Sequence, residues 1–384
     1  MKVLISGASV AGPALAGWLG RQGHDVTVVE VAEALRSGGY AVDFRGPTHM
    51  KVLSCMGLMD ELRSLATGGS PMRFVDASGR QLFRLPGEFA GGELEVLRSE
   101  LSRVLYEHSR DVAGYTFGDT ITSLTETSSG VDVTFRRGAA RTFDLVIGAD
   151  GLHSTVRRLA FGPESQFVSH LGYYLASWSL PAPVDGEAQY YNEPGRLASI
   201  GPGGAFTIFA SPQRDHDRHD IESQKALVRN ALAGMGWQAP ALLRSLDTAD
   251  DLYLDSISRV DVTAWSQGRI ALLGDAAHGA TLGGMGTGSA IVGAYVLAGE
   301  MARAGGDHRT AYTRYEAMLS GYARRCQKGG DRTGRFLAPR TRLGLRLRNR
   351  LLSTGFVMDW LIKAGQEVSS DIALPDYPLR EPAL

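Results

Sequence analysis

The chain has 384 residues, which suggests two or three domains of about 150 residues each, or one large domain with inserts. Its 40 Lys and Arg residues against 41 Asp and Glu residues give a net charge of −1, so no overall basic field draws it to nucleic acid or anionic lipid. With 43% hydrophobic and 21% charged residues, the composition is that of a folded protein and excludes a disordered one.

The cysteine content indicates a reducing, cytoplasmic setting. Cys55 and Cys326 exclude a disulfide framework, a four-cysteine zinc site and a CxxC redox motif. Glycines and Pro13 interrupt the apolar N-terminus, which argues against a secretory signal. No run of about 18 uninterrupted apolar residues is present, so we expect no stable membrane insertion.

The N-terminal segment predicts a strand, a turn, a helix and a second strand. Residues 2–6 are a short apolar run, and residues 10–19 carry apolar side chains at helical spacing. Residues 25–30 are rich in β-branched side chains and end in an acid. The pattern is a βαβ unit.

The turn of this unit predicts a phosphate cradle. Gly7 permits a tight turn, Gly12 lets the helix pack on the strand, and Ser9 is small enough for a pyrophosphate to approach the helix N-terminus. Glu30, at the end of the second strand, can accept hydrogen bonds from ribose hydroxyls. The alternative is a glycine loop with a purely structural role, and the cradle by itself does not separate NAD from FAD.

Further along the chain, the residue pattern changes and then returns to that of the N-terminal segment. Residues 98–107 predict a helix and residues 120–150 predict strands, after which residues 169–254 are aromatic and β-rich, with a helix at 220–235 and a break at Pro240. Residues 269–273 again predict a buried strand, and residues 290–303 a helix.

We therefore expect an α/β fold: a discontinuous Rossmann-like domain, an inserted β-sheet substrate domain and a C-terminal helical segment. The expected boundaries are residues 1–70, 96–168 and 265–320 for the first domain, 71–95 and 169–264 for the second, and 321–384 for the helical segment.

The segment 321–350 holds ten Arg and Lys residues against one acid, Asp331. It could be a patch for nucleic acid or membrane, or a helix whose basic side chains extend over the core. Leucines at 343, 345, 347, 351 and 352 interleave with the arginines and the whole chain is nearly neutral, so we favour a solvated helix face whose basic side chains extend over the core.

Three later segments carry a family resemblance. Arg98 lies in EVLRSEL, Asp150 in VIGADGLHSTVR and Asp275 in GRIALLGDAAH. Together with GGYAVDFRGP at 38–47 and the glycine-rich 284–300, they resemble the FAD-dependent class A monooxygenases, the aromatic hydroxylase family. The resemblance covers nearly the whole chain and is strongest to the branch with tetracycline-modifying and polyketide-tailoring enzymes.

The resemblance implies a set of FAD-binding residues: Gly7, Ser9, Gly12, Glu30, Arg98, Asp150, Asp275, Gly286 and Gly288. The glycine turn would hold the pyrophosphate, the acid at 30 the adenosine ribose, and the acid at 275 the ribityl chain. The cation at 98 would reach the flavin side, and the acid at 150 matches a motif associated with FAD and nicotinamide. The helix that opens near 286 would place its N-terminal amides at the flavin.

The resemblance also implies the reaction. NAD(P)H would reduce FAD, O2 would form a flavin C4a-hydroperoxide, and one oxygen atom would pass to an electron-rich small molecule. No side-chain nucleophile is expected, so the catalytic residues are unknown. Rival interpretations are a Baeyer–Villiger oxygenase, a reductase, and a non-enzymatic FAD-binding protein. The sequence leaves open whether the protein is a monomer or a homodimer.

Three departures from the family pattern concern the flavin and adenosine sites. Val31 stands where an arginine is usual, and Gly288 stands where many members carry asparagine. The loop 278–284 is one residue shorter than usual and lacks the customary proline. We therefore expect an altered loop path under the flavin.

Three residues of the aromatic sheet are candidates for substrate binding: Trp178, Arg196 and Phe206. The aromatic rings could stack on a fused ring system or could be ordinary core, and the arginine could bind an enolate or face solvent. With Tyr190, Tyr191 and Phe209 they suggest a bulky polycyclic substrate of polyketide or tetracycline type.

Two groups of histidines are weaker candidates for a functional role. His216 and His219 are better explained as a charged loop than as a metal site, so no metal is expected. His278 is more readily explained by packing beside the cofactor than as a general base.

Overall fold

The computed structural model describes residues 1–35, 41–69, 71–214, 217, 220–279, 282, 285–353 and 372–377. Its first sheet has six strands in the order β17-β18-β11-β1-β2-β7, all parallel except the β17–β18 pair. These strands are β1 (Lys2–Ser6), β2 (Asp25–Glu30), β7 (Gly114–Phe117), β11 (Leu145–Gly148), β17 (Ser266–Gln267) and β18 (Ile270–Leu272).

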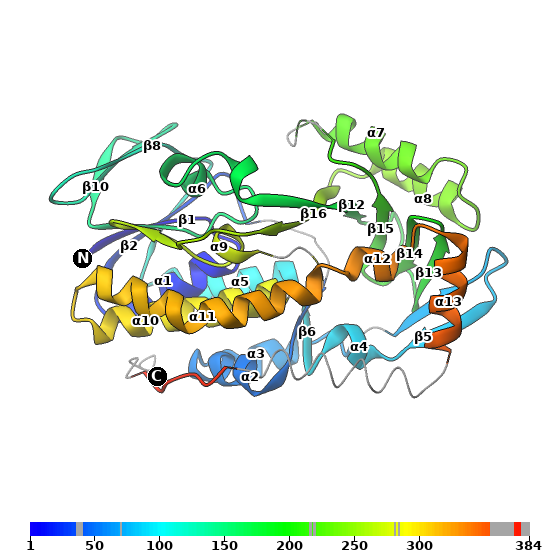
Figure 1. The fold of residues 1–384 in the computed structure, drawn as a ribbon, viewed down its shortest axis with the longest axis horizontal. Helices are drawn as coiled ribbons and strands as arrows, with labels where there is room; N and C mark the ends of the chain where they lie inside the picture. The colour runs from blue at the N-terminus through cyan, green and yellow to red at the C-terminus, as the bar shows by residue number, and fades with distance from the viewer. Residues whose placement is uncertain are drawn as a thin grey trace.

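Helices cover one side of this sheet and a small antiparallel sheet covers the other (Figure 1). The helices are α1 (Ala11–Arg21), α5 (Arg98–Ser109), α10 (Gly286–Arg303) and α11 (His308–Gly330). The small sheet, in the order β10-β9-β8, comprises β8 (Ile121–Glu126), β9 (Val131–Phe135) and β10 (Arg141–Phe143), beside α6 (Thr155–Ala160). The predicted βαβ unit is confirmed, because β1, α1 and β2 follow the expected ranges within two residues.

A second sheet has seven strands in the order β16-β12-β15-β14-β13-β4-β5. The strands are β4 (Met72–Val75), β5 (Gln81–Leu85), β12 (Val168–Trp178), β13 (Ala188–Glu193), β14 (Arg196–Gly201), β15 (Gly204–Ala210) and β16 (Tyr253–Val260). All pairs are antiparallel except β13 with β4, which are parallel.

Two helices cover one face of the second sheet, α7 (Ile221–Leu232) and α8 (Ala239–Thr248) (Figure 1). Asp220 caps α7, since its carboxylate accepts the backbone N–H groups of Glu222 and Ser223. Pro240, predicted as a break, instead lies in the first turn of α8, where a missing N–H costs nothing.

Short elements join the two sheets. β3 (Ala41–Phe44) pairs with β6 (Leu94–Leu97) in an antiparallel two-stranded sheet. The remaining short elements are α2 (Gly46–Cys55), α3 (Met59–Ser64), α4 (Gly87–Gly91), the 3-10 turn η1 (Glu164–Gln166) and α9 (Asp275–His278).

The C-terminal part of the described chain is helical. α11 runs beneath the six-stranded sheet toward the second sheet, where α12 (Thr333–Leu337) and α13 (Arg342–Leu352) follow (Figure 1). The leucines of α13 are divided between the interior and the surface. Leu345 and Leu352 are buried, but Leu343, Leu347 and Leu351 are 76%, 57% and 48% exposed.

The α/β fold class with a C-terminal helical segment is confirmed. The second sheet draws its strands from residues 72–85 and 168–260, between parts of the first sheet, and on this basis we propose the domain division given above. Among the helices that the structure describes, none is long and apolar enough to cross a bilayer.

Candidate functional site

The parallel strands bring four of the predicted residues to one edge. β18, β11, β1 and β2 are neighbours, and their carboxyl ends lead to Asp275, Asp150, Gly7 and Glu30. Ligands of open α/β sheets bind outside the carboxyl ends of the strands. This edge is therefore the candidate site.

The turn between β1 and α1 accepts only glycine at two positions. Gly7 has φ +108°, and a Cβ there would lie 2.5 Å from the Ala149 carbonyl oxygen. A Cβ at Gly12 would lie 1.9 Å from the carbonyl oxygen of Gly7. The Gly7 N–H donates to the Val29 oxygen at 2.8 Å, which ties the turn to β2. The turn is thus pressed against its own helix, as a pyrophosphate cradle requires.

Glu30 braces that cradle from the neighbouring strand. Its carboxylate accepts the N–H of Ala8 at 2.8 Å and the N–H of Ala32 at 3.0 Å. The following residue, Val31, is 44% exposed, so the position that usually carries an arginine presents an apolar side chain to solvent. A carboxylate at this place keeps acceptor capacity for ribose hydroxyls.

Arg98, Ser9 and Asp275 come together from distant parts of the chain. The Arg98 guanidinium donates to the Ser9 hydroxyl at 3.4 Å, and Arg98 begins α5 directly after β6. The pKa of the Asp275 carboxyl is raised, mainly because the group is removed from water. The nearby charge of Arg98 opposes this shift, and the charge of Asp255 adds to it. A carboxylate and a cation at one edge suit the hydroxyl and phosphate oxygens of a dinucleotide.

Asp150 is engaged by its own chain. Its carboxylate accepts the N–H groups of Thr155 at 2.8 Å and Val156 at 3.1 Å, together with the hydroxyls of Ser154 and Ser6. Burial raises the pKa of this carboxyl, and these hydrogen bonds lower it. Asp150 thus stabilises the N-terminus of α6, and its predicted contact with FAD and nicotinamide stays a prediction.

Arg157 is a residue that the sequence reasoning did not single out. Its side chain is fully buried and donates to the carbonyl oxygens of Leu152 at 2.6 Å and Ala276 at 2.9 Å. It therefore links the loop after β11 to the loop after β18. The available signal was its place at the end of the motif that contains Asp150.

His153 makes a second link, between the two sheets. Its Nδ1 lies 2.9 Å from Glu164 and its Nε2 lies 3.2 Å from Asp255 on β16. Burial by itself lowers the pKa of His153, but the hydrogen bonds with Asp255 and Glu164 raise it overall. The histidine holds the second sheet beside the loop of Asp150.

Gly288 is explained by a neighbour rather than by a ligand. A Cβ there would lie 2.3 Å from the imidazole of His49. His49 is buried, accepts the Arg45 N–H at 3.0 Å and lies 2.8 Å from the Tyr322 hydroxyl. The imidazole occupies the space that an asparagine would need at 288, which accounts for this departure from the family pattern.

The N-terminus of α10 is expected to lie at the flavin, and this placement stays a prediction. The helix begins at Gly286 after Met285, which has φ +54°, and Leu282 has φ +62°. The first N–H groups of a helix have no partner within it and can bind an anion, and the contact of Gly286 and Gly288 with FAD stays a prediction. Most of the shortened loop lies outside the described residues, as do residues 38–40 of the GGYAVDFRGP segment.

His278 packs away from solvent, and its imidazole lies tilted against Trp265 with 4.5 Å between ring centroids. Burial lowers its pKa to about 4, so the ring is neutral at pH 7. Its Nε2 is buried and has no hydrogen-bond partner among the described residues. This is a packed, uncharged histidine, in keeping with the packing interpretation. His216 and His219 lie outside the described residues.

The three predicted substrate residues do not share a face. Phe206 packs with Tyr190, Tyr253 and Leu282 on the face turned toward the loop that follows Asp275. Trp178 lies on the opposite face, where its indole N–H donates to Ser245 of α8 at 3.0 Å. Strand alternation separates these side chains, and α7 and α8 cover the second face.

Arg196 is also directed toward the covering helix α7. Its guanidinium pairs with Glu193 and donates to the carbonyl oxygens of Ala231 and Ala233, the latter at 2.9 Å. These bonds tie β14 to the end of α7. Trp178 and Arg196 are both engaged with the covering helices, and their role in substrate binding stays a prediction. Tyr191 and Phe209 belong to the same covered face.

The residues at the edge fit FAD. The glycine turn leaves no room for a Cβ, Glu30 and Asp275 offer acceptors, and Arg98 offers a cation. Among the described residues no group of His, Cys, Asp and Glu could hold a metal ion. The arrangement can bind a long dinucleotide and leave the chemistry to its flavin.

Comparison with known proteins agrees with this arrangement. The model of a family described as FAD binding domain matches residues 1–328. An uncharacterized protein of Mycobacterium tuberculosis is 40% identical over 340 residues, covering 85% of this chain and 91% of its own. A flavin-dependent monooxygenase of Legionella longbeachae is 36% identical over 347 residues, covering 86% and 88%. The crystal structure of the tetracycline destructase Tet(51) superposes with a TM-score of 0.86 at 30% identity, covering 98% of this chain and 99% of that one.

Proposed function

We propose that this chain, which belongs to the family of FAD-dependent class A monooxygenases, uses NAD(P)H and O2 to hydroxylate an electron-rich polycyclic aromatic or polyketide-type small molecule. The reaction balances as substrate, O2, NAD(P)H and a proton giving hydroxylated substrate, water and NAD(P)+. Bound FAD supplies the redox chemistry, accepting hydride and activating O2.

The chain's own residues bind and orient the cofactor. The Gly7 to Gly12 turn and the N-terminus of α1 would hold the pyrophosphate, and Glu30 the adenosine ribose. Asp275 would accept hydrogen bonds from the ribityl hydroxyls, with Arg98 beside it. Arg157 holds the loop of Asp275 in place through its hydrogen bond to the Ala276 carbonyl oxygen.

The substrate class rests on the face of the seven-stranded sheet that α12 and α13 cover only in part. Tyr190, Phe206 and Tyr253 are only partly buried there and share a cluster with Leu282. Burial raises the pKa of Tyr190, so its hydroxyl is a neutral hydrogen-bonding group. Planar rings with a polar edge suit stacking on a fused, oxygenated ring system. The name of Tet(51), a tetracycline destructase, supports the same class.

The direct test is NAD(P)H oxidation by the purified FAD-loaded protein with tetracyclines or anthraquinones, compared with simple hydroxybenzoates. We expect faster oxidation with the large substrates and a product heavier by one oxygen atom. Coupled turnover with only the small phenols would reject the large-substrate class. A product that gains two hydrogens would identify a reductase, and a ring-expanded product in NMR would identify a Baeyer–Villiger oxygenase.

A matched pair of variants tests the proposed substrate face. Phe206 and Phe209 lie on the same strand, β15, but on opposite faces of the sheet. Phe206→Leu should raise KM for the large substrate several-fold with little change in FAD content, since a stacked ring pair contributes about 1 kcal/mol. Phe209→Leu should affect stability and leave KM in place. Equal KM values in both variants would remove Phe206 from the proposed surface.

A further inference from the structure

Helix α13 presents an apolar stripe to solvent. Leu343, Leu347 and Leu351 follow one another at four-residue spacing and are 76%, 57% and 48% exposed. Residues four apart lie on one face of a helix, so these leucines form a continuous row. They account for three of the seven large exposed hydrophobic side chains among the described residues.

A row of arginines runs beside the leucines. Arg342, Arg346 and Arg350 are exposed and share the same four-residue spacing. Within the described part of the chain, none of the three forms an ion pair or a side-chain hydrogen bond. From Arg332 to Ser353 the sequence contains no Asp or Glu. The outward face of α13 is therefore both apolar and locally cationic, although the whole chain has a net charge of −1.

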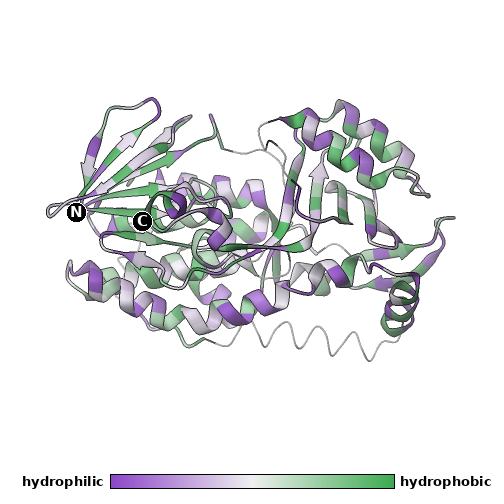
Figure 2. Ribbon diagram, turned by 45° about the horizontal axis from the view of Figure 1, so that its top comes forward, coloured by the Kyte–Doolittle hydropathy of each residue, from purple (hydrophilic) through white to green (hydrophobic). Residues whose placement is uncertain are grey.

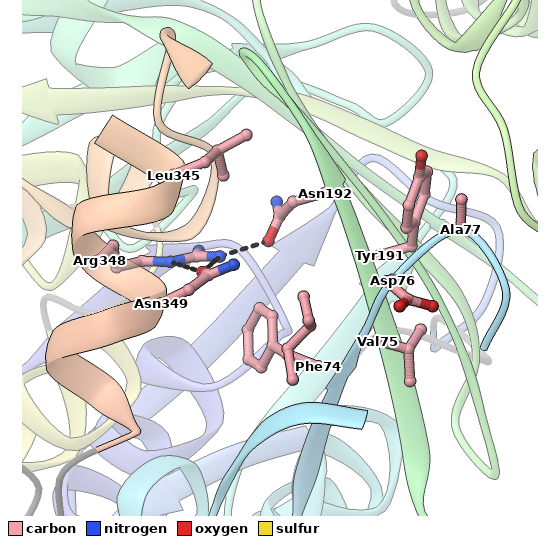
Figure 3. Close-up of a pocket in the computed structure, with 10 residues that line it drawn as sticks. Phe74, Val75, Asp76, Ala77, Tyr191, Asn192, Leu345, Arg348 and Asn349 are labelled. Carbon is pink, nitrogen blue, oxygen red and sulfur yellow. Dashed lines mark hydrogen bonds between the residues drawn. The ribbon is translucent and has the colours of Figure 1, made fainter. Parts of the chain in front are cut away.

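The inward face holds α13 firmly against the second sheet. Arg348 is buried and donates to the carbonyl oxygens of Phe336 and Leu337 at 3.0 Å and to the Asn192 side chain at 2.8 Å (Figure 3). Its guanidinium also lies 5.0 Å from the centroid of the Phe74 ring. The exposure of the leucines is thus imposed by the way the helix is anchored.

The helix also stands at the rim of the molecule. It packs on β5 and β13 at the end farthest from the six-stranded sheet, where its ribbon carries both hydrophobic and hydrophilic segments (Figure 1 and Figure 2). A pocket of about 170 Å³ lies between α13 and β4, lined by Leu345 of α13 and Phe74 of β4 among others (Figure 3).

We propose that the outward face of α13 docks the protein on an anionic phospholipid surface. The helix lies parallel to the membrane, its leucines enter the boundary between headgroups and acyl chains, and its arginines bind the phosphate groups. This is peripheral binding, consistent with the finding that no described helix is long and apolar enough to span a bilayer.

Charge selects this occupant over a second copy of the chain. A two-fold contact through α13 would place the arginine row of one copy beside that of the other, with no acid on the helix to neutralise it. Like charges in such a contact oppose association. An anionic lipid surface supplies the missing negative charge and also buries the leucines.

The test is vesicle flotation with the full-length, FAD-loaded protein. We expect binding to phosphatidylcholine vesicles that contain about 30% phosphatidylglycerol, little binding to pure phosphatidylcholine, and release when salt rises to about 0.5 M. Replacing Arg342, Arg346 and Arg350 by glutamine should weaken vesicle binding about 100-fold, at roughly tenfold or less per cation. Replacing the three leucines by serine should weaken it by about tenfold or more.

A control variant removes the same charge elsewhere. It replaces three exposed arginines remote from α13 by glutamine: Arg63, Arg110 and Arg136. Its vesicle binding should equal that of the unmodified protein. The proposal is overturned if the unmodified protein binds neither vesicle, if it binds both equally, or if the control loses as much binding as the α13 variant. It is also overturned if sedimentation shows a dimer that the leucine variant abolishes, since the face would then join two copies.

Discussion

The guanidinium of Arg157 donates to the backbone carbonyl of Ala276 at 2.9 Å, across 119 positions of the sequence. The same side chain donates to Leu152 at 2.6 Å. One buried cation thus joins the loop that follows β11 to the loop that follows β18. Two of the predicted cofactor residues, Asp150 and Asp275, lie in these loops, so their relative position depends on a residue that need not touch the cofactor.

Removing that cation should loosen both loops. Arg157→Met keeps the length of the side chain but leaves the carbonyls of Leu152 and Ala276 without their donor, at a cost of about 2–4 kcal/mol in the free energy of unfolding. Urea denaturation measures this cost, and the flavin content of the purified protein should fall with it. The adjacent Arg158 is exposed, so Arg158→Met is the control. Equal stability of the two variants would contradict the linking role.

The phosphate turn should not tolerate a methyl group. Gly12→Ala would place its Cβ 1.9 Å from the Gly7 oxygen, so helix and turn must separate and FAD binding should be lost. A Cβ at Gly203 has no neighbour within 4 Å, and Gly203→Ala should therefore retain FAD. Fluorescence of flavin released on denaturation compares the two. Full FAD content in Gly12→Ala would show that the turn is not the cradle.

Glu30 should contribute directly to FAD affinity. Glu30→Ala removes a charged acceptor and the brace on Ala8, and we expect the FAD dissociation constant to rise by the equivalent of about 1–3 kcal/mol. Titration of the apoprotein with FAD provides the value. Glu33→Ala, which removes a largely exposed acid three residues later, is the control and should bind FAD as tightly as the unmodified chain.

Asp275 should matter more for flavin retention than His278. Asp275 follows β18 at the carboxyl edge beside Arg98, whereas the imidazole of His278 lies tilted against Trp265. Asp275→Asn keeps the shape and removes the charge, so FAD should dissociate more readily on gel filtration. His278→Phe preserves the ring contact and should retain FAD. A His278→Phe protein that keeps its FAD but no longer turns over would instead indicate proton transfer by the histidine.

Two buried histidines predict a loss of stability in acid. Burial lowers the pKa of His49 and of His278 to about 4, below the value of about 6.5 for an unfolded chain. Between these values the unfolded state binds protons that the folded state does not. The free energy of unfolding should therefore fall, by about 1.4 kcal/mol per pH unit for each histidine, as pH drops from about 6.5 toward 4.

Urea midpoints measured at several pH values across this window check that slope. His278→Phe should make the dependence shallower by about one proton, while stability above pH 7 changes far less with pH. An unchanged slope in the variant would mean that the imidazole of His278 is charged in the folded protein.

Local features of the sequence determined the βαβ unit and its cradle. The apolar run of β1, the glycines at 7 and 12 and the acid at 30 lie within one short segment, where period and turn chemistry act over a few residues. Parallel strands then bring their carboxyl ends to one edge whatever the loops contain, which is why Asp150 and Asp275 could be assigned to the same region as Gly7.

The tertiary structure decided which side chains are free to meet a ligand. Alternation along β14 and β15 predicts that neighbouring side chains face opposite ways. Only the tertiary packing shows that α7 and α8 cover the face of Trp178, whereas α12 and α13 leave Phe206 on the other face partly exposed. Likewise, the sequence shows that Leu343, Leu347 and Leu351 share one face of α13, but it does not show which face is buried. The tertiary structure shows that the face of Arg348 packs on the second sheet and that these three leucines are exposed. Pairings between residues far apart in the chain, such as Arg157 with Ala276, depend on the folded path and leave no local pattern to be recognised.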